Sequence, residues 1–522
     1  MVNLWKRESS VRDTNYCDLF SHLGNGQYEH LSRELQQGKT EKSTDVSIAY
    51  RLQGNDLFRE NKIAQAMELY NKSLCFAEIG TENVSLVYAN RSSCFLALKM
   101  YEEALIDIEL AVKAKYPDRL MAKLMRRQAT CLRLMEAEPQ RKRFQPKLSF
   151  QSHDRYPCLA NSLEMKCNQK FGRHIVATRD IEVDKMILVE RNFASVSIDD
   201  ERMSCAKCMK TKANFIACSM CTDAMYCCID CMQRDATHKM TCGQFNGVDG
   251  SMKLYIQTVF IAISLFKNVD NLMEFVEEAL KSNGIQESMM DAKSQYRLFL
   301  SIQPSINEHD KDDLMFDAQK IYIILQSTPT IKILFGSVAK QRFLQHLVLH
   351  HLLVTVRNRF QVSADGDHLK TTEIASITCI FNHSCYPNAF NHVIDNQSVL
   401  ITIRPVEKGE QLFISYLGEE TEKSTDFRRM SLMNDFGFFC ECDKCVPRCS
   451  RSDRVAMEMD SYFKYIKQNY KIAFDEKVRR IALKEVCIRF LNKYGHLPWS
   501  DELNLVTFCY VKWFFEYSTV DY

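Results

Sequence analysis

The sequence has almost no net charge. Its 68 lysines and arginines nearly cancel its 66 aspartates and glutamates, which leaves a formal charge of +2. Proteins that bind nucleic acid along their length usually carry a clear excess of basic residues. The balance therefore argues against a general nucleic-acid-binding protein, although it leaves room for a local basic patch.

Long hydrophobic runs are also missing. The longest, LYIQTVFIAISLF at 254–266, contains glutamine and threonine. It is shorter than the roughly 20 apolar residues that a helix needs to cross a bilayer, so it predicts a buried helix and no membrane span. The first residues, MVNLWKRESS, are charged and have no apolar segment behind them, so we expect no secretory signal.

Cysteine, in contrast, is plentiful, with 22 residues among 522. In a short secreted chain this content would indicate disulfides, but this chain is long and shows no secretory signal. Clustered cysteines are then better interpreted as metal ligands. The length predicts two to four domains, and the content of 46% hydrophobic and 26% charged residues is that of a soluble globular protein.

A helical pattern with an internal repeat occupies residues 45–138. Gly54 and Ala66 are small residues on its first apolar face, and 87–112 repeats part of this pattern with Ala104 in the place of Ala66. Small residues recur where paired helices approach closely, and the pattern resembles tetratricopeptide repeats. An unrelated helical bundle is the alternative. Two or three repeats are marginally stable alone, so we expect them to pack on the later part of the chain.

The rest of the chain alternates between strand-like and helical patterns. Residues 174–198 and 374–417 are rich in β-branched residues that alternate with polar ones, which predicts short strands. Residues 250–360 and 452–518 have helical periodicity. A cysteine-dense block at 205–242 comes after the first strand-like part. Together these patterns predict an α+β protein of several domains.

The cysteine-dense block contains four pairs at ligand spacing. Two residues between cysteines place both thiolates on one tight turn, and three residues between ligands place both on one side of a helical turn. Eight ligands suit two tetrahedral zinc ions, and closed four-ligand sites are structural. The candidate ligands are Cys205, Cys208, Cys218, Cys221, Cys227, Cys231, His238 and Cys242.

The spacing resembles the MYND finger, in which the pairs interleave. The resemblance assigns Cys205, Cys208, Cys227 and Cys231 to one zinc ion and the other four candidates to the second. It leaves Cys228 as a spare cysteine. MYND fingers elsewhere bind proline-rich peptides, so the block is also a candidate protein-interaction module.

A second cluster, CECDKC, contributes only three cysteines: Cys440, Cys442 and Cys445. A tetrahedral zinc site needs a fourth ligand. That ligand must come from a distant part of the chain or from Cys449, four residues further on.

Four further motifs occur in order along the chain. They are KFGRHIVATRDI (170–181), NHSCYPN (382–388), GEQLFISYLG (409–418) and FGFFCECDKC (436–445). With the cysteine-dense block between the first two, they resemble the SET-and-MYND protein-lysine methyltransferases. The N-terminal repeats resemble the branch of that family that carries tetratricopeptide repeats.

The resemblance implies an α+β multidomain fold, in which a β-rich SET domain is split by a MYND zinc finger and a helical insertion. The implied parts are an irregular N-terminus (1–44), helical repeats (45–138), the first part of the SET domain (155–200), the MYND finger (205–242), the helical insertion (243–345), the SET core (346–417), a post-SET zinc cluster (430–449) and a short C-terminal helical lobe (450–522).

The resemblance also implies a cofactor, S-adenosylmethionine, and the residues that bind it. Gly172, Arg173 and His174 match its first loop, where glycine lets the backbone approach and arginine can meet the carboxylate. Tyr416 matches the catalytic tyrosine. The other implied positions are Asn358, Asn382, His383, Tyr416 and Phe438 for the cofactor, Phe436 and Phe438 for the substrate channel, and Cys385 as the fourth ligand of a third zinc ion.

The chain departs from the family pattern shortly before and after these motifs. Ala375 and Ser376 stand where the family has Tyr-Pro, and Phe436 stands where many members have tyrosine. We therefore expect an intact cofactor pocket and an altered lysine channel. A thiol hydrolase built on His383 and Cys385 is disfavoured, because such partners usually come from distant segments.

These features predict a protein-lysine N-methyltransferase that acts on histone or non-histone proteins in gene regulation, in the cytoplasm and nucleus. The alternative is a catalytically weak scaffold that recruits histone deacetylase corepressors or chaperones through the finger and the repeats. Arg51, Asn55 and Asn90 match three of the five positions of a clamp for the C-terminal carboxylate of a chaperone tail. Neither a membrane nor nucleic acid is an expected partner.

Overall fold

The computed structural model describes most of the chain. The expected irregular N-terminus lies outside the described residues up to residue 40, as does the linker segment 138–143. The described ranges are 41–137, 144–198, 201–211, 213–244, 248–281, 291–302, 311–364, 369–394, 396–446, 448–471 and 477–517.

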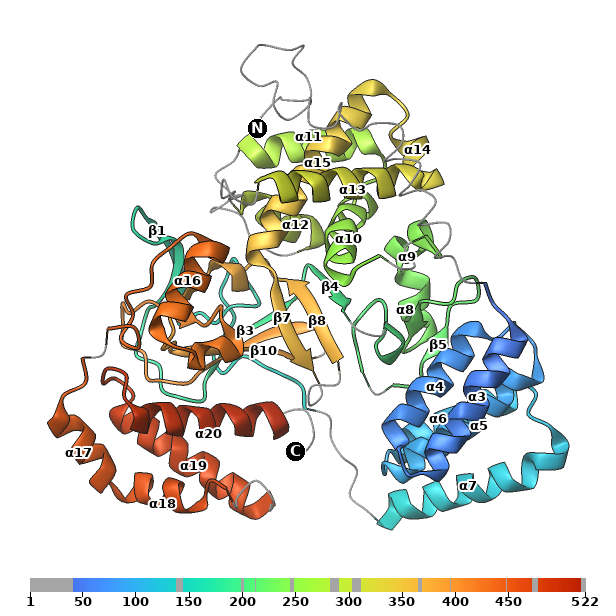
Figure 1. Cartoon of the computed structure of the whole chain (residues 1–522), viewed down its shortest axis with the longest axis horizontal. Helices are drawn as coiled ribbons and strands as arrows, with labels where there is room; N and C mark the ends of the chain where they lie inside the picture. Colours follow the sequence, from blue (N-terminus) through green and yellow to red (C-terminus); the bar gives the residue numbers. More distant parts are fainter. Residues whose placement is uncertain are drawn as a thin grey trace.

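The N-terminal part is helical and forms one side of the molecule, drawn in blue and cyan (Figure 1). Its helices are α3 (Thr44–Arg59), α4 (Ile63–Phe76), α5 (Glu82–Ala97), α6 (Tyr101–Lys113) and α7 (Asp118–Ala137). The small residues of the repeat pattern lie between paired helices. A Cβ atom at Gly54 of α3 would lie 2.7 Å from the ring of Tyr70 in α4, so α3 and α4 can approach this closely only with glycine there.

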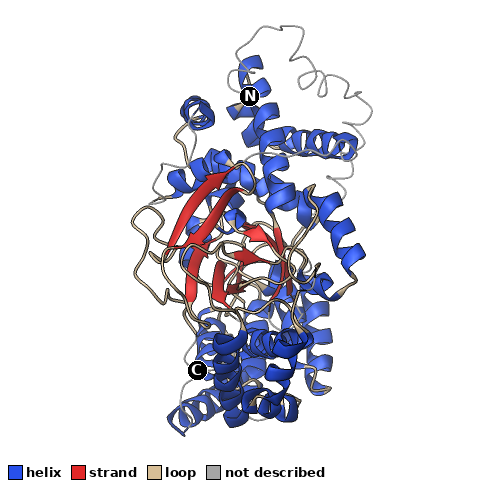
Figure 2. Ribbon diagram, turned by 90° about the vertical axis from the view of Figure 1, so that its left-hand side faces the viewer, coloured by secondary structure: helices blue, strands red, loops and turns tan. Residues whose placement is uncertain are grey.

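Small sheets form the centre of the molecule, with helices above and below them (Figure 2). One sheet has the order β10 (Ala389–Ile394), β11 (Gln397–Thr402), β3 (Met186–Arg191), and another has the order β4 (Ala194–Ser197), β8 (Leu369–Ile374), β7 (Phe360–Ala364); both are antiparallel. In each sheet, a strand from before residue 198 pairs with one from after residue 368.

Three two-stranded sheets complete the β structure. They are β1 (Leu163–Asn168) with β2 (Gly172–Ala177), β5 (Ile216–Ala217) with β6 (Met225–Tyr226), and the parallel pair of β9 (Asn382–His383) with β12 (Phe413–Ile414). The parallel pair brings the NHSC motif beside the ISYLG motif. The predicted α+β class is confirmed in this coarse form.

Further helices surround these sheets. The longest apolar run of the sequence lies mostly in a buried helix, α10, and none of the described helices meets the length and hydropathy that a membrane span requires. The remaining helices are α8 (Ile229–Arg234), α9 (Ala236–Thr241), α10 (Gly250–Ser264), α11 (Val269–Lys281), α12 (Ala292–Ser301), α13 (Lys311–Ser327), α14 (Pro329–Leu334), α15 (Val338–Asn358), α16 (Thr425–Phe436), α17 (Arg451–Met459), α18 (Ser461–Asn469), α19 (Lys477–Tyr494) and α20 (Asp501–Tyr517).

The N-terminal helices pack on the cysteine-dense block, as the sequence predicts for this part of the chain. Phe215 and Tyr226 of this block belong to the same apolar core as Ala66 and Tyr70 of the repeats. All four side chains are almost completely buried. The block therefore covers one face of a short helical array that would be marginally stable by itself.

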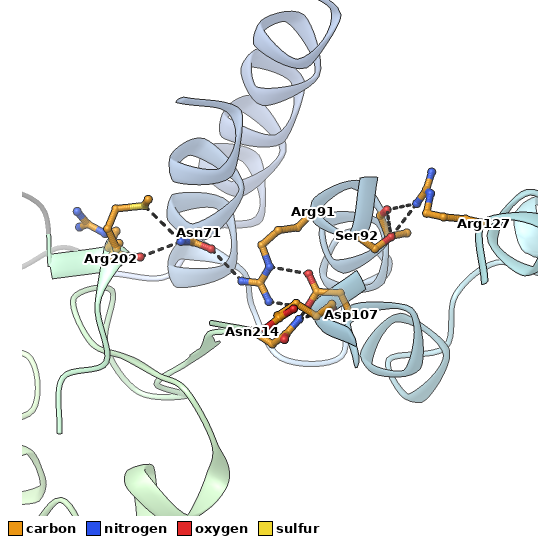
Figure 3. Close-up of polar contacts among 10 residues, drawn as sticks. Asn71, Arg91, Ser92, Asp107, Arg127, Arg202 and Asn214 are labelled. Carbon is orange, nitrogen blue, oxygen red and sulfur yellow. Dashed lines mark hydrogen bonds and ion pairs between the residues drawn. The ribbon is translucent and has the colours of Figure 1, made fainter. Parts of the chain in front are cut away.

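A buried polar network crosses this interface (Figure 3). The guanidinium of Arg91 donates to both carboxylate oxygens of Asp107, at 2.7 and 2.8 Å, and to Asn71 Oδ1 at 2.8 Å. Asn214 Nδ2, from the cysteine-dense block, donates to Asp107 Oδ1 at 2.7 Å, and Asn71 Nδ2 donates to the carbonyl of Arg202 at 2.9 Å. The network therefore joins three of the repeat helices to the segment after them.

Arg91→Met tests the energetic weight of this network. The change leaves the Asp107 carboxylate buried without its cation, which typically costs about 3–5 kcal/mol. We expect the first urea unfolding transition, followed by circular dichroism, to move to a clearly lower urea concentration.

Arg59→Met is the matched control, because Arg59 pairs with Asp56 at 2.8 Å on the exposed face of α3. Exposed pairs contribute about 0–1 kcal/mol, so this variant should unfold close to the wild type. Equal midpoints for the two variants would contradict a stabilising role of Arg91.

Candidate metal centres and candidate active site

The cysteine-dense block brings its eight candidate ligands into two groups. In each group the ligand atoms lie within 4.8 Å of one another. Cys227 Sγ lies 3.5 Å from Cys208 Sγ and 3.6 Å from Cys231 Sγ. Cys218 Sγ lies 3.8 Å from Cys242 Sγ and 3.4 Å from His238 Nε2.

These separations suit zinc. With zinc–sulfur bonds of about 2.3 Å, two sulfurs at the corners of a tetrahedron are about 3.8 Å apart. The two groups are the interleaved sets that the resemblance to a MYND finger predicts: Cys205, Cys208, Cys227 and Cys231, then Cys218, Cys221, His238 and Cys242.

Short helices orient the ligands of this block. Cys228 caps α8, because its sulfur accepts the N–H of Cys231 at 3.4 Å. Asp235 caps α9 by accepting the N–H of His238 at 3.0 Å, and it also accepts the hydroxyl of Tyr226 at 3.2 Å. Cys228 is thus outside the ligand sets but helps to orient Cys231, a role that sequence spacing does not reveal.

A third group forms where two distant segments meet. Cys385, just after β9, joins Cys440, Cys442 and Cys445, which come after α16. Cys385 Sγ lies 3.9 Å from Cys440 Sγ and 3.6 Å from Cys445 Sγ. Of the two sources left open by the cysteine count, the structure brings in Cys385, and Cys449 is not part of the group.

Two charged side chains beside the third group were not predicted. Four thiolates around a divalent ion carry a net charge of −2, and buried Arg428 donates to Cys445 Sγ at 3.4 Å. Burial acts to lower the pKa of Arg428, but the sulfurs of Cys445 and Cys385 raise it on balance. Lys444, also buried, pairs with Glu422 at 2.7 Å. A lone arginine on a helix carries no sequence signal for this role.

His383 connects this third group to Tyr416. Its Nδ1 accepts the backbone N–H of Tyr416 at 2.9 Å, so the ring proton of the neutral imidazole must be on Nε2. Nε2 lies 3.2 Å from Cys385 Sγ, where it can donate to a thiolate. Burial lowers the pKa of His383 to about 4, which keeps the ring neutral. Both ring nitrogens are therefore engaged within the protein.

Tyr416 lies in an aromatic environment with its hydroxyl held in place. The hydroxyl donates to the carbonyl of Phe381 at 2.7 Å. Its ring centroid lies 4.8 Å from that of Phe436 and 5.3 Å from that of His383, and Phe438 lies 5.9 Å from His383. Burial, with a smaller effect of Cys379, raises the pKa of Tyr416, so the group stays a neutral phenol.

Gly172, Arg173 and His174, which the sequence predicts to be a cofactor loop, form the start of strand β2 next to the NHSC segment. Asn382 Nδ2 donates to the carbonyl of Phe171 at 3.1 Å, which ties the turn to the residue before Gly172. Gly172 has a φ of +60° in open space, so glycine is favoured there by its backbone conformation rather than by crowding. The structure thus brings Asn382 to the predicted cofactor loop.

Arg173, on β2, brings a partly buried guanidinium to this region. Its Nη1 donates to Ser301 Oγ at 3.0 Å, and burial lowers its pKa. Among the described residues, no aspartate or glutamate pairs with it. An arginine in this situation suits a carboxylate ligand. The ring of His174 lies against its own strand, and its Nδ1 is 2.9 Å from the carbonyl oxygen of Gly172.

Asn358 is placed differently from the other predicted cofactor residues. Its side-chain nitrogen donates to the carbonyl of Val354 in its own helix at 2.7 Å. Its backbone carbonyl accepts from Cys379 Sγ at 3.2 Å, which connects the end of α15 to the turn before NHSC. Asn358 therefore lies beside the site, and none of its described hydrogen bonds is with Gly172, Arg173 or His174.

Comparison with known proteins identifies one family model in the chain, the SET domain, over residues 172–417. Protein-lysine N-methyltransferase SMYD4 of Mus musculus is 22% identical over 84% of this chain and 72% of its own length, and the Homo sapiens protein of that name is 22% identical over 78% and 68%. A SET and MYND domain-containing protein of Dictyostelium discoideum is 22% identical over 58% of this chain and 85% of its own length.

Among solved structures, Rubisco LSMT bound to sinefungin and monomethyllysine overlaps 69% of this chain and 85% of its own. The identity is 12% and the TM-score is 0.27. A score this low supports no argument about the present fold.

Zinc content tests the third group. We expect elemental analysis of the purified protein to find one zinc ion for each of the three groups, and Cys385→Ser to lose one of them, because a serine hydroxyl cannot replace a thiolate ligand. Cys228→Ser is the matched control, since serine can still cap α8. Full zinc content in Cys385→Ser would show that another ligand completes the site.

Proposed function

The chain belongs to the SET-and-MYND family of SET-domain proteins, and from this premise we propose that it is an S-adenosylmethionine-dependent protein-lysine N-methyltransferase. The observation that carries the proposal is the position of Tyr416. Its hydroxyl is fixed on the carbonyl of Phe381, among aromatic rings and beside the segment that contacts Phe171.

The donor set suits the cofactor. When bound, S-adenosylmethionine supplies a methyl group on a positively charged sulfur, together with an amino-acid carboxylate. Arg173 would hold the carboxylate, since it lacks an acidic partner among the described residues. Asn382 and His383 would line the same pocket, and the faces of Phe436 and Phe438 would favour a cation through cation–π attraction.

Transfer of a methyl group to an amine is an in-line displacement that needs a neutral amine, alignment and the exclusion of water. Alignment in a narrow channel can contribute roughly 7–11 kcal/mol in favourable cases. An apolar channel next to a positive charge lowers the pKa of the incoming lysine, because both disfavour a second cation.

The hydroxyl of Tyr416 would orient this amine. Its proton is directed at the carbonyl of Phe381, so the lone pairs of the oxygen remain to accept from the amine or to stabilise the methyl group electrostatically. Its raised pKa disfavours a phenolate, which argues against Tyr416 as a general base. Phe436 adds a wall without a second hydroxyl, which can change how many methyl groups the channel accepts.

The proposal also includes a SET domain that is built from two separate parts of the chain. The SET domain would be interrupted by the MYND finger (205–242) and the helical insertion (243–345), with zinc in all three ligand groups. The pairing of β3 with β11 and of β4 with β8 supports this division, because each pair joins strands from the two sides of the interruption.

The partners and the compartment are further proposals. We expect a protein substrate, histone or non-histone, in the cytoplasm and nucleus, and a finger that recruits corepressors through proline-rich peptides. A chaperone tail would bind the repeats through Arg51, Asn55 and Asn90. These side chains are engaged internally: Arg51 bonds Asn83 at 2.5 Å, and Asn55 accepts from Asn90 at 2.8 Å. A tail would have to compete with these bonds.

Tyr416→Phe tests the function. Removing one well-placed hydroxyl from a transition-state environment typically costs about 10²–10³ in rate, so we expect radiolabelled methyl transfer to histones and to lysate proteins to fall by about that factor. Tyr465→Phe, on the surface of α18, is the control and should keep wild-type activity.

The scaffold alternative makes the opposite prediction. It expects wild-type protein that binds S-adenosylmethionine in a calorimetric titration and labels no protein in either assay. That result would overturn the proposed enzyme activity while leaving the zinc sites in place.

A further inference from the structure

Glu190 is a fully buried acidic residue that follows four apolar residues in β3. A carboxylate in this position costs several kcal/mol unless hydrogen bonds replace its lost hydration. Neither the lysine-transfer chemistry nor the zinc groups use it. Its contacts therefore need an explanation of their own.

The hydrogen bonds of Glu190 go to one turn. Oε1 accepts the N–H of Ile377 at 2.8 Å, and Oε2 accepts both the N–H and the hydroxyl of Thr378, at 2.8 and 2.9 Å. The turn is separated from Glu190 by 187 residues in the sequence. Because both oxygens face backbone N–H groups, the side chain at 190 must offer an acceptor at each position.

This turn leads directly to the proposed methyl-transfer site. Thr378 begins the short 3-10 turn Thr378–Ile380, and the N–H of Phe381 bonds back to the carbonyl of Thr378 at 3.2 Å. The carbonyl of Phe381 then accepts the hydroxyl of Tyr416, and Asn382 contacts the cofactor loop through Phe171. Thr378, which the Glu190 carboxylate binds, is thus close in sequence to Phe381, whose carbonyl accepts the Tyr416 hydroxyl.

We propose that Glu190 is a positioning residue of the methyl-transfer site: its carboxylate fixes the 377–381 turn, and through it the Phe381 carbonyl that holds the Tyr416 hydroxyl. The inference rests on the proposed function for its catalytic consequence, whereas the anchoring of the turn can be tested without turnover. In this role Glu190 would act through the turn and not by contact with substrate or cofactor.

A second buried glutamate provides a matched control. Glu373 on β8 accepts from Asn192 Nδ2 at 2.5 Å, and none of the hydrogen bonds among the described residues joins its side chain to the turn. Its other oxygen has no hydrogen-bond partner among the described residues. Burial, and next the charge of Glu190, raise the pKa of Glu373 to about 8, which favours its protonated form and makes glutamine a close substitute. Burial also raises the pKa of Glu190, but the hydrogen bonds from Ile377 and Thr378 act to lower it.

The first measurement is hydrogen exchange of the full-length, zinc-loaded protein. In Glu190→Gln the new amide group points a donor at an N–H of the turn, and in Glu190→Ala both N–H groups lose their acceptor. We expect the amides of Ile377 and Thr378 to exchange at least about tenfold faster in both variants, and at the wild-type rate in Glu373→Gln. Wild-type exchange in Glu190→Gln would overturn the proposal, whether or not Glu190→Ala folds.

The second measurement separates kcat from KM. A small misplacement of a reacting group can cost about 10²-fold in rate, so we expect kcat for methyl transfer to fall about 10- to 100-fold in Glu190→Gln, with KM for the acceptor protein within about threefold of wild type and zinc content unchanged. An equal loss of kcat in Glu373→Gln, or a wild-type kcat in Glu190→Gln, would overturn the positioning role.

The two readouts distinguish the two hypotheses. A wild-type protein without any methyl transfer defeats the proposed function, and the exchange rates still decide whether Glu190 anchors the turn. Faster exchange together with unchanged kcat would show an anchor that does not serve catalysis, which contradicts the inference.

Discussion

The candidate active site depends on a group of four thiol ligands contributed by two segments that are 55 residues apart. Cys385 comes after the turn that carries Asn382 and His383, and the other three ligands come after the helix that carries Phe436. A metal ion there would hold these segments together with several strong bonds and so couple metal binding to folding. Asn382 and His383 lie beside Cys385, Phe436 and Phe438 lie beside Cys440, and Tyr416 packs against the same group.

Around this group, hydrogen bonds between different elements fix the position of Tyr416. His383 accepts from the backbone of Tyr416 and faces Cys385 with its protonated nitrogen, so the orientation of the tyrosine is linked to the metal ligands. From the other side, Glu190 fixes the turn that supplies the acceptor for the Tyr416 hydroxyl. The backbone and the hydroxyl of one residue are thus held by separate contacts, which leaves little freedom for its ring.

Buried charges recur at the junctions between parts of the chain. Arg91 and Asp107 join the N-terminal helices to the cysteine-dense block, Arg428 offsets the thiolates of the third ligand group, and Glu190 joins β3 to the 377–381 turn. Each is satisfied by partners from another element, and a buried charge without its partners is strongly destabilising. Such groups therefore favour one relative arrangement of the parts over others.

Most of the element types could be predicted from local patterns, since the helical repeats and the strand-like segments carry their periodicity in a few neighbouring residues. The ligand pairs of the cysteine-dense block were predicted for the same reason, because pairs such as Cys205 and Cys208 are recognisable by their spacing. Arg428, Glu190 and the carbonyl of Phe381 could not be predicted, because an isolated charged residue or a backbone group has no spacing to recognise. The role of Cys228 was also not predicted, because its spacing does not distinguish a cysteine that caps a helix from one without a role.

The sequence by itself determined which residues could be ligands and in which order the motifs occur, because these properties lie in short stretches of chain. From cysteine spacing alone it left the fourth ligand of the third group open between Cys449 and a distant cysteine. Only the tertiary structure decided that Cys385 lies beside Cys445, which ring nitrogen of His383 carries the proton, and which turn Glu190 holds. These depend on contacts between residues that are tens to hundreds of positions apart, and such contacts form only when the strands and helices have packed.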